Sequence, residues 1–597
     1  MRITRAVTPL PGDSHSRANW HRYVPRLAVP YDSDSHGVEV DRHPWSSRVP
    51  VPLVLGVVSC VLASVLVRAQ ARDWTTSGFD AQRTRWVTTD ARLTKAAVEE
   101  NGLRFLWKAT FDNEARQLHS LTQPILQDLL IGYRGFKSLA FIGGSADRLF
   151  SIDTDLGKPY WTTHLTYAAA TGSVPGSTGD CPGGLLATPS RRTPLSPSTF
   201  GRSGGRRGGR SLSAVGEPGQ GAAVLKRVAE SKSPPSDPPP PPPQAGARTI
   251  APIPFGGVDP IFVMASDGLL RTLRVSDGAM MEPPAAFLPP STYPSSLVFV
   301  DGFVYTTTTN GCGAAPNALW ALDTLSPEKK VTRWEAGGAN IVGTTGPALG
   351  TDGRLFVALA PGTPGSASTG RSGDRSPAVP DNALVALDRD TLTVKDWFAP
   401  AEGSFNAPPV VFSHGNREMI AITATDGRLF LLDGRSLGGS DHRTPLHVTP
   451  RAGTPGLSPG LATWQDETTR WILAPVGDTI VAFTVSDTEG GAPAALRAWE
   501  SRPLISPLAP IVVNGMVFVA SSGEFRGEGA AGSAKARADR STPAVLYALD
   551  GVTGKELWTS GTTITSFARA GLSAGNGQVY VVTYDNTLYA FGIPMEH

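Results

Sequence analysis

Two stretches far apart in the chain share the spacing of three residues. Residues 151–161 (SIDTDLGKPYW) and 548–558 (ALDGVTGKELW) each place a Gly four positions after an Asp and a Trp eight positions after it. An apolar segment ends at each Asp, as half-buried β-strands do. The Asp carboxylate can accept hydrogen bonds from the backbone that follows, and Gly can adopt the positive φ of a tight turn. The motif therefore predicts a strand, a turn and a second strand. The residues to which it assigns this structural role are Asp153, Gly157, Trp161, Asp550, Gly554 and Trp558.

Strands that end in Asp recur along most of the chain. Their markers are Asp153, Asp277, Asp323, Asp388, Asp433, Asp487 and Asp550. Another strand precedes several of them, with the type I′ hairpin pairs Asp-Gly or Asn-Gly at 301–302, 514–515 and 576–577. The unit is a four-stranded antiparallel meander of roughly 40 to 50 residues, which is the period of a propeller blade. Because one blade has two apolar faces, it needs a neighbour on each side.

The last repeat is incomplete. Seven markers give seven blades, and residues 585–592 (DNTLYAFG) supply the third strand of an eighth, after which only IPMEH remains. A spare strand precedes the first blade at residues 103–111, and it places Trp107 where other blades carry their Trp. We therefore expect an all-β, eight-bladed propeller in which the N-terminal strand completes the last blade.

One long apolar run lies near the start of the chain. Residues 49–67 contain no charge, and Ala69 and Ala71 fit the small-residue pattern of signal cleavage. The run is also long enough to be a single transmembrane helix. Both interpretations predict export to the periplasm or cell envelope, with a membrane anchor at 49–67 if the segment stays uncleaved.

The expected organisation has four parts. It comprises an irregular segment 1–48, a signal peptide or anchor at 49–71, a propeller at 72–597, and an insertion at 167–251 within the propeller. The insertion is rich in Pro, Gly and Arg, so it cannot bury enough apolar area to offset its chain entropy and should be disordered. Its Arg-Gly pattern could contact nucleic acid or an anionic surface, but a solvated loop is favoured. With 18% charged residues and a net charge of +2, we expect no nucleic-acid partner.

Three cysteines are present. Cys60 lies in the apolar run, which leaves Cys181 and Cys312 as a pair in an exported domain. An oxidising compartment favours a disulfide between them. Two free buried thiols remain the alternative, because sequence alone does not place their Cα atoms within bonding distance.

Residues 548–558 resemble the repeat of the pyrroloquinoline-quinone-type β-propellers. Residues 73–86 (DWTTSGFDAQRTRW) resemble the opening of exported quinoprotein alcohol dehydrogenases. The resemblance implies Trp residues that dock between blades, and a quinone with calcium in the mouth of an eight-bladed ring. It also implies a vicinal disulfide, whereas no two cysteines of this chain are adjacent.

Two function classes follow from the resemblance. The preferred one is an exported, non-catalytic propeller that serves as a scaffold for an unknown envelope protein or a small ligand, as outer-membrane assembly propellers do. The alternative is a quinoprotein dehydrogenase that uses pyrroloquinoline quinone and calcium to oxidise alcohols or sugars. The sequence assigns no catalytic residue, cofactor-binding residue or metal ligand, and a fold alone does not establish chemistry.

Overall fold

The fold is described from a computed structural model. It describes residues 73–132, 135–166, 181–195, 259–362, 379–452, 458–526 and 533–594. The predicted segments 1–48 and 49–71 lie outside these ranges, so the signal peptide or anchor stays a prediction. Across the described ranges, no helix combines the length and the apolar character needed to cross a membrane.

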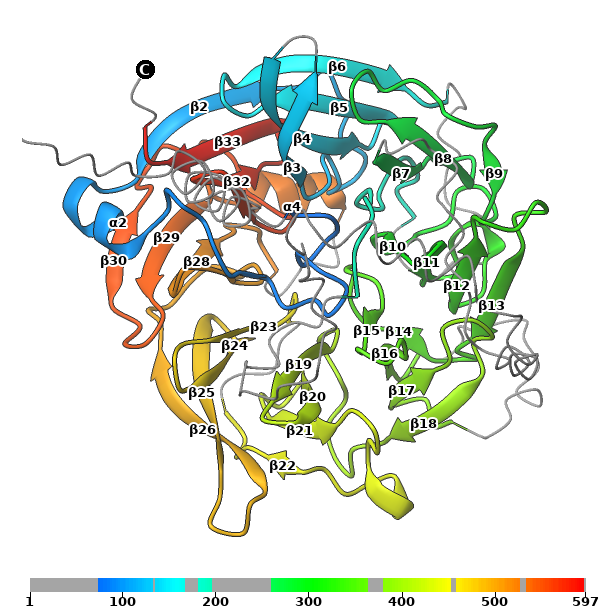
Figure 1. Ribbon diagram of the computed structural model, residues 1–597, viewed down its shortest axis with the longest axis vertical. Helices are drawn as coiled ribbons and strands as arrows, with labels where there is room; N and C mark the ends of the chain where they lie inside the picture. Colours follow the sequence, from blue (N-terminus) through cyan, green and yellow to red (C-terminus); the bar gives the residue numbers. More distant parts are fainter. Residues whose placement is uncertain are drawn as a thin grey trace, which may run out of the picture. The chain divides into compact units, whose positions relative to one another are not determined.

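Eight β-sheets form a ring, and each is one blade (Figure 1). Blade 1 contains β3 (Ile125–Gly132), β4 (Gly135–Gly144), β5 (Arg148–Asp153) and β6 (Lys158–His164); blade 2 contains β7 (Pro260–Met264), β8 (Leu269–Arg274) and β9 (Ala285–Ala286). Blade 3 contains β10 (Val298–Val300), β11 (Phe303–Thr308), β12 (Ala318–Asp323) and β13 (Val331–Glu335); blade 4 contains β14 (Asn340–Ile341), β15 (Ala348–Leu349), β16 (Leu355–Ala360), β17 (Leu384–Leu387) and β18 (Val394–Phe398).

The second half of the ring repeats this plan. Blade 5 contains β19 (Val410–His414), β20 (Arg417–Thr423), β21 (Leu429–Asp433) and β22 (His447–Val448); blade 6 contains β23 (Ala462–Gln465), β24 (Arg470–Val476), β25 (Thr479–Asp487) and β26 (Pro493–Glu500). Blade 7 contains β27 (Ile511–Val513), β28 (Met516–Ser521), β29 (Val545–Asp550) and β30 (Glu556–Thr559), and β1 (Trp86–Val87) joins β27 in parallel. Blade 8 contains β31 (Ser573–Gly575), β32 (Gln578–Val582), β33 (Thr587–Gly592) and β2 (Arg104–Thr110). Within the described ranges the α-helices are α2 (Lys95–Asn101) and α4 (Ala534–Arg540).

The ring closes through its first long strand. β2 pairs antiparallel with β33, from Arg104 opposite Gly592 to Thr110 opposite Thr587. The predicted eight blades and the predicted closure by the N-terminal strand are therefore confirmed.

Burial falls from the axis outward within a blade. In blade 3 the inner strands β10 and β11 are fully buried, whereas the outermost strand β13 is only partly buried. Inner strands have a blade against each face, so their apolar residues need not alternate with polar ones.

The Trp of one blade docks on the turn of the next blade. The indole N–H of Trp499 in β26 donates to the Gly551 carbonyl in the β29–β30 turn at 3.0 Å, and Trp107 of blade 8 donates to Thr154 of blade 1 at 3.0 Å. A Cβ on Gly554 would lie 2.6 Å from the Trp499 ring. The Asp and Gly of the motif thus form a turn on which the Trp of the preceding blade docks. The Trp of the same motif docks on the following blade.

The expected insertion at 167–251 needs one correction. Residues 181–195 belong to the fold, since Ser190 exchanges backbone hydrogen bonds with Phe262 of β7 at 3.0 and 2.8 Å and forms the inner edge of blade 2. Leu185 and Ala187 beside it are buried. The segment reads as a loop because it contains Pro and Ser and its partner strand lies about seventy residues further along the chain. The remainder, 167–180 and 196–251, lies outside the described residues.

The same segment carries one of the paired cysteines. Cys181 and Cys312 are bonded in the structure, with 5.5 Å between their Cα atoms, and both are buried. The bond joins the segment that enters blade 2 to the β11–β12 connection of blade 3. Its presence in the purified protein stays a prediction.

Candidate functional site

An irregular segment, residues 74–90, runs along the inner strands at the centre of the ring and is called the plug here (Figure 1, blue). Its backbone carbonyls accept hydrogen bonds from the inner strands of successive blades, at 2.8 to 3.0 Å. The pairs are Trp74 with Leu126, Thr75 with Arg191, Ala81 with Leu349, Gln82 with Val411, Thr84 with Thr463 and Arg85 with Val512. Side chains of the plug bind blades 3 and 8. The Thr76 hydroxyl donates to the Leu297 carbonyl of blade 3, and the Asp90 carboxylate accepts from the Gly577 N–H of blade 8. The plug therefore contacts all eight blades.

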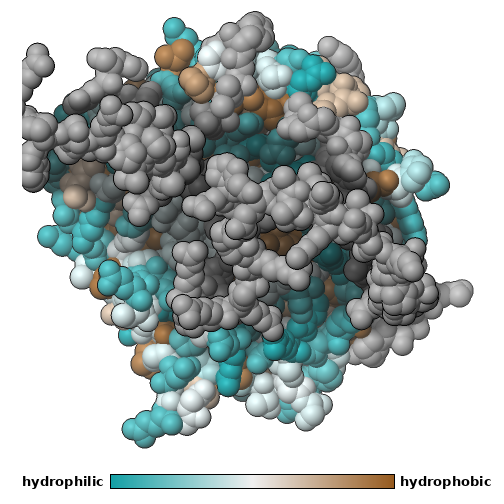
Figure 2. Space-filling model, in the orientation of Figure 1, coloured by the Kyte–Doolittle hydropathy of each residue, from teal (hydrophilic) through white to brown (hydrophobic). Residues whose placement is uncertain are grey.

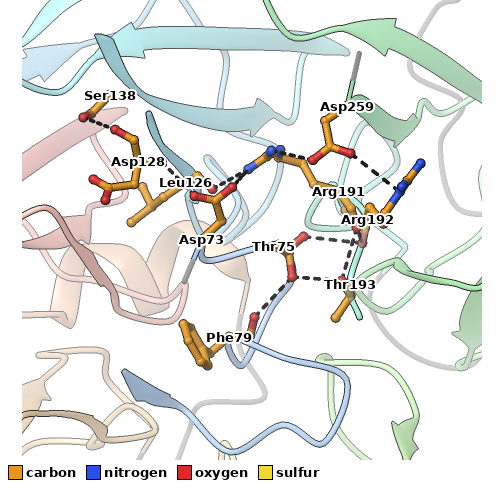
Figure 3. A network of polar contacts seen from close by, with 11 residues as sticks. Asp73, Thr75, Phe79, Leu126, Asp128, Ser138, Arg191, Arg192, Thr193 and Asp259 are labelled. Atoms are coloured by element: carbon orange, nitrogen blue, oxygen red, sulfur yellow. Dashed lines mark hydrogen bonds and ion pairs between the residues drawn. The ribbon is translucent and has the colours of Figure 1, made fainter. Parts of the chain in front are cut away.

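A buried ion-pair network holds the start of the plug (Figure 3). The Arg191 side chain is 1% exposed, and its guanidinium lies 2.6 Å from the Asp73 carboxylate and 2.8 Å from that of Asp259. Arg191 also donates to the Leu126 carbonyl at 2.9 Å, and Asp73 accepts from the Asp128 N–H at 2.9 Å. A buried cation with two carboxylates and a carbonyl is compensated, so this network is structural.

A cavity of about 160 Å³ lies where the loops that enter the inner strands converge. Its walls come from blades 1 to 4 and 6 to 8, and Ser77 and Arg85 of the plug also line it. We call it the axial pocket. It has room for on the order of ten water molecules, at ~10–15 Å³ each.

Hydroxyl, apolar and cationic groups line the axial pocket. Its titratable and charged side chains are Arg85, His119, Tyr293, Arg569 and Tyr584, and no Asp or Glu contributes to the lining. Burial lowers the pKa of His119 well below its ordinary value, and the charges of Arg569 and Arg537 add to the effect. The imidazole is therefore neutral at neutral pH, with Nε2 3.4 Å from the Tyr293 hydroxyl.

Two guanidinium groups lie beneath the cavity in the plug. Arg83 is 0% and Arg85 4% exposed, and Arg85 donates to the Leu461 carbonyl at 2.6 Å. Burial lowers the pKa of Arg85 to about 10, and burial with the Arg85 charge lowers that of Arg83 to about 9. Asp80 is the one carboxylate that raises both pKa values. Its carboxylate accepts from the Thr84 N–H at 2.9 Å and from the Thr84 hydroxyl at 2.6 Å.

Several polar atoms around these arginines have no hydrogen-bond partner in the described part of the chain. They are both amide atoms of Gln82, Arg83 Nη2, Thr345 Oγ1 and Ser458 Oγ. Arg83 Nη2 lies near Gly346, the neighbour of Thr345, and Thr345 lines the cavity. Buried polar groups are usually paired, so those of these atoms that lie beside the cavity could be satisfied by water or a ligand there. Unpaired buried atoms also occur elsewhere, for example Arg271 Nε and Arg470 Nε.

A second cationic group forms part of the wall. The Glu524 carboxylate, 1% exposed, accepts from Arg526 and from Arg537 of α4 at 2.7 Å each. Arg569 lines the cavity with Nη1 3.8 Å from the same carboxylate, too long for a hydrogen bond. Three guanidinium groups share one carboxylate, so the wall carries a net positive charge.

The residues of the quinone site implied by the resemblance are not found in this lining. A calcium ion needs several oxygen ligands, carboxylates among them, and neither a carboxylate, a Trp nor a Cys lines the axial pocket. Elsewhere among the described residues, no cluster of three or more His, Cys, Asp or Glu side chains could hold a metal ion. The quinone with calcium therefore does not fit this site.

The sequence-predicted residues lie elsewhere. Trp107, Trp161 and Trp558 belong to the outermost strands β2, β6 and β30. Asp153 and Asp550 are the last residues of β5 and β29. None of them lines the axial pocket. The residues that do, Arg85, His119 and Arg569, carry no sequence motif, apart from the position of Arg85 in the segment that resembles quinoprotein openings.

Neither a protein-family model nor a curated protein sequence matches the chain. Solved structures of similar fold include quinohemoprotein alcohol dehydrogenase from Comamonas testosteroni, with 14% identity, 89% of this chain and 82% of that chain covered, and a TM-score of 0.49. They also include a europium-containing methanol dehydrogenase (10% identity, 88% and 99% covered, TM-score 0.49) and BamB from Moraxella catarrhalis (11% identity, 83% and 99% covered, TM-score 0.42). The likeness is one of fold alone, and the eight-bladed ring rests on the strand pairing of this chain.

Proposed function

We propose that the chain is a non-catalytic binding propeller of the cell envelope, with the axial pocket as its ligand site. The observation that supports this proposal is the lining, which combines hydroxyl, apolar and cationic groups without a carboxylate. The lining lacks the paired acid and base that hydrolysis or alcohol oxidation requires. His119 is a weak base because of its lowered pKa, and its ring contacts Tyr293.

The coloured part of the surface in Figure 2 shows no large hydrophobic patch. Hydrophobic residues of the described chain are scattered there among hydrophilic ones (Figure 2). The exposed large hydrophobic residues belong to separate elements, with Phe136 in β4, Leu496 in β26 and Val552 after β29. Scattered single residues do not indicate an interface, which favours the pocket.

Calorimetric titration with pyrroloquinoline quinone in calcium-containing buffer tests the proposal against the dehydrogenase alternative. We expect no submicromolar, calcium-dependent binding, and no reduction of an artificial electron-accepting dye with ethanol or glucose. A quinoprotein dehydrogenase assayed in parallel is the positive control. Calcium-dependent binding together with dye reduction would establish the alternative.

A further inference from the structure

We infer that the axial pocket binds a small oxyanion, a carboxylate or phosphate group, which contacts Arg85 and is attracted by Arg569 in the wall. The inference rests on the proposed function, because it names the ligand class of the same site. Its basis is the charge balance of the buried arginines.

Arg191 and Arg85 are equally buried but differently paired. Arg191 has two carboxylates within 2.8 Å. Among the described residues no carboxylate lies within ion-pair distance of Arg85, whose Nη1 donates only to carbonyl oxygens, those of Leu461 and Arg83. Arg83 adds a second buried cation beside it. An uncompensated buried charge is costly, and a bound anion removes that cost.

The geometry leaves Arg85 accessible from the cavity. Arg85 lines the pocket, and its guanidinium lies against Gly460, where a Cβ would approach Nη2 to 2.6 Å. Any larger side chain at that position would displace the guanidinium. Thr345 also lines the pocket with its hydroxyl buried without a partner, whereas the Ser77 hydroxyl in the same lining donates to Gln123 at 2.7 Å. A planar guanidinium with hydroxyl donors nearby suits carboxylate and phosphate oxygens.

Other ligand classes suit the site less well. A neutral sugar would leave the charges of Arg83 and Arg85 uncompensated, and a cation would be repelled by them and by Arg569. The cavity volume of about 160 Å³ accommodates inorganic phosphate or a short dicarboxylate such as succinate, each with some water. We therefore use these two probes, which also distinguish a phosphate ligand from a carboxylate ligand.

The test is calorimetric titration of the full chain with phosphate and with succinate, at fixed pH and ionic strength. We expect one site per chain. Arg85→Gln should weaken binding of the better probe by about 10- to 100-fold, the effect of losing a hydrogen bond to a charged group, and Arg569→Gln should weaken it less. Arg148→Gln is the matched control, because the Arg148 side chain is as exposed as that of Arg569, 29%, and pairs with Asp112 outside the pocket. Equal affinity in Arg85→Gln, or no binding of either anion, would overturn the inference.

A second measurement needs no variant, in case Arg85→Gln fails to fold. Phenylglyoxal modifies arginine, and peptide mass mapping reports the rate at each site. The better probe should slow modification of Arg569 and leave that of Arg148 unchanged; equal rates with and without both anions would overturn the inference.

Titrations with glucose and with the quinone distinguish failure of this inference from failure of the proposed function. Binding of glucose without binding of either anion would overturn the inference and leave a binding propeller in place. Calcium-dependent quinone binding with dye reduction would overturn both.

Discussion

Substitution of Gly554 by Ala tests the docking of Trp499 between blades 6 and 7. Gly554 has φ +73°, and a Cβ there would lie 2.6 Å from the Trp499 ring. The control is Gly561→Ala in the same blade, where φ is +54° and a Cβ would meet nothing within 4 Å. Both changes place a Cβ on a left-handed residue, so only the contact with Trp499 differs between them.

The expected loss of stability has two parts, the cost of the left-handed backbone and the cost of the clash. A left-handed non-Gly residue costs about 1–2 kcal/mol, and overpacking costs a further 1–3 kcal/mol or so. For a domain of roughly 500 residues, the unfolding entropy makes 1 kcal/mol worth about 1 °C in melting temperature. Gly561→Ala should therefore lower the melting temperature by about 1–2 °C, and Gly554→Ala by about 2–5 °C.

Differential scanning calorimetry of the two variants measures the difference. Combining Gly554→Ala with Trp499→Ala should remove the clash, so that the glycine change then costs no more than the control. If Gly554→Ala and Gly561→Ala lower the melting temperature equally, or if the cost of Gly554→Ala is unchanged without Trp499, the docking is not tight and the account of the repeat is refuted.

Three further predictions concern the ring closure, the disulfide and a buried acid. Trp107→Ala should lower the melting temperature by about 2–4 °C, since it leaves a cavity where the N-terminal strand contacts blade 1; an unchanged value would contradict the closure. Thiol titration in denaturant without reductant should find no thiol from Cys181 and Cys312, and replacing both by Ser should lower the free energy of unfolding by up to about 4–5 kcal/mol; two titratable thiols besides Cys60 would contradict the bond. Burial, with the charges of three nearby Asp residues, raises the pKa of Asp128 to about 6. The folded state then holds a proton that the unfolded state, with a pKa of ~3.9, releases, so this group lowers stability as pH rises from about 4 to 6. The change in melting temperature from wild type to Asp128→Asn should therefore be more favourable at pH 8 than at pH 4. An equal change at both pH values would contradict the shifted pKa.

The blades could be predicted because their signals are local. An Asp that accepts backbone hydrogen bonds, as Asp550 does from Val552 and Thr553, acts within three residues of itself, and the next Gly and Trp keep a fixed spacing. The closure was also predictable, because the last repeat lacks a strand that β2 supplies. The inner segment at 181–195 was missed, since its partner β7 is remote and its composition is that of a loop.

The axial pocket could not be predicted, for a related reason. The plug has no hydrophobic period, and its residues contact a succession of different blades, so neither helix nor strand periodicity marks it. Its partners extend from Leu126 to Gly577 along the chain. His119 and Arg569 come from loops whose convergence depends on the closed ring.

The arginines of the plug are costly to the stability of the fold. Other buried cations are paired with carboxylates, as with Arg191 between Asp73 and Asp259 and Arg271 with Asp267. Arg470 of β24, 3% exposed, instead donates to Gln465 and lies over the rings of Trp86 and Phe412. At the axis, where a leucine or methionine would pack without a desolvation cost, the chain instead holds Arg83 and Arg85 with orphaned polar atoms around them. Departures from local rules are expected where function opposes stability. A bound oxyanion would resolve both the unpaired charge and the unpaired hydroxyl of Thr345, so the features that cost the empty protein stability are those that the ligand would use.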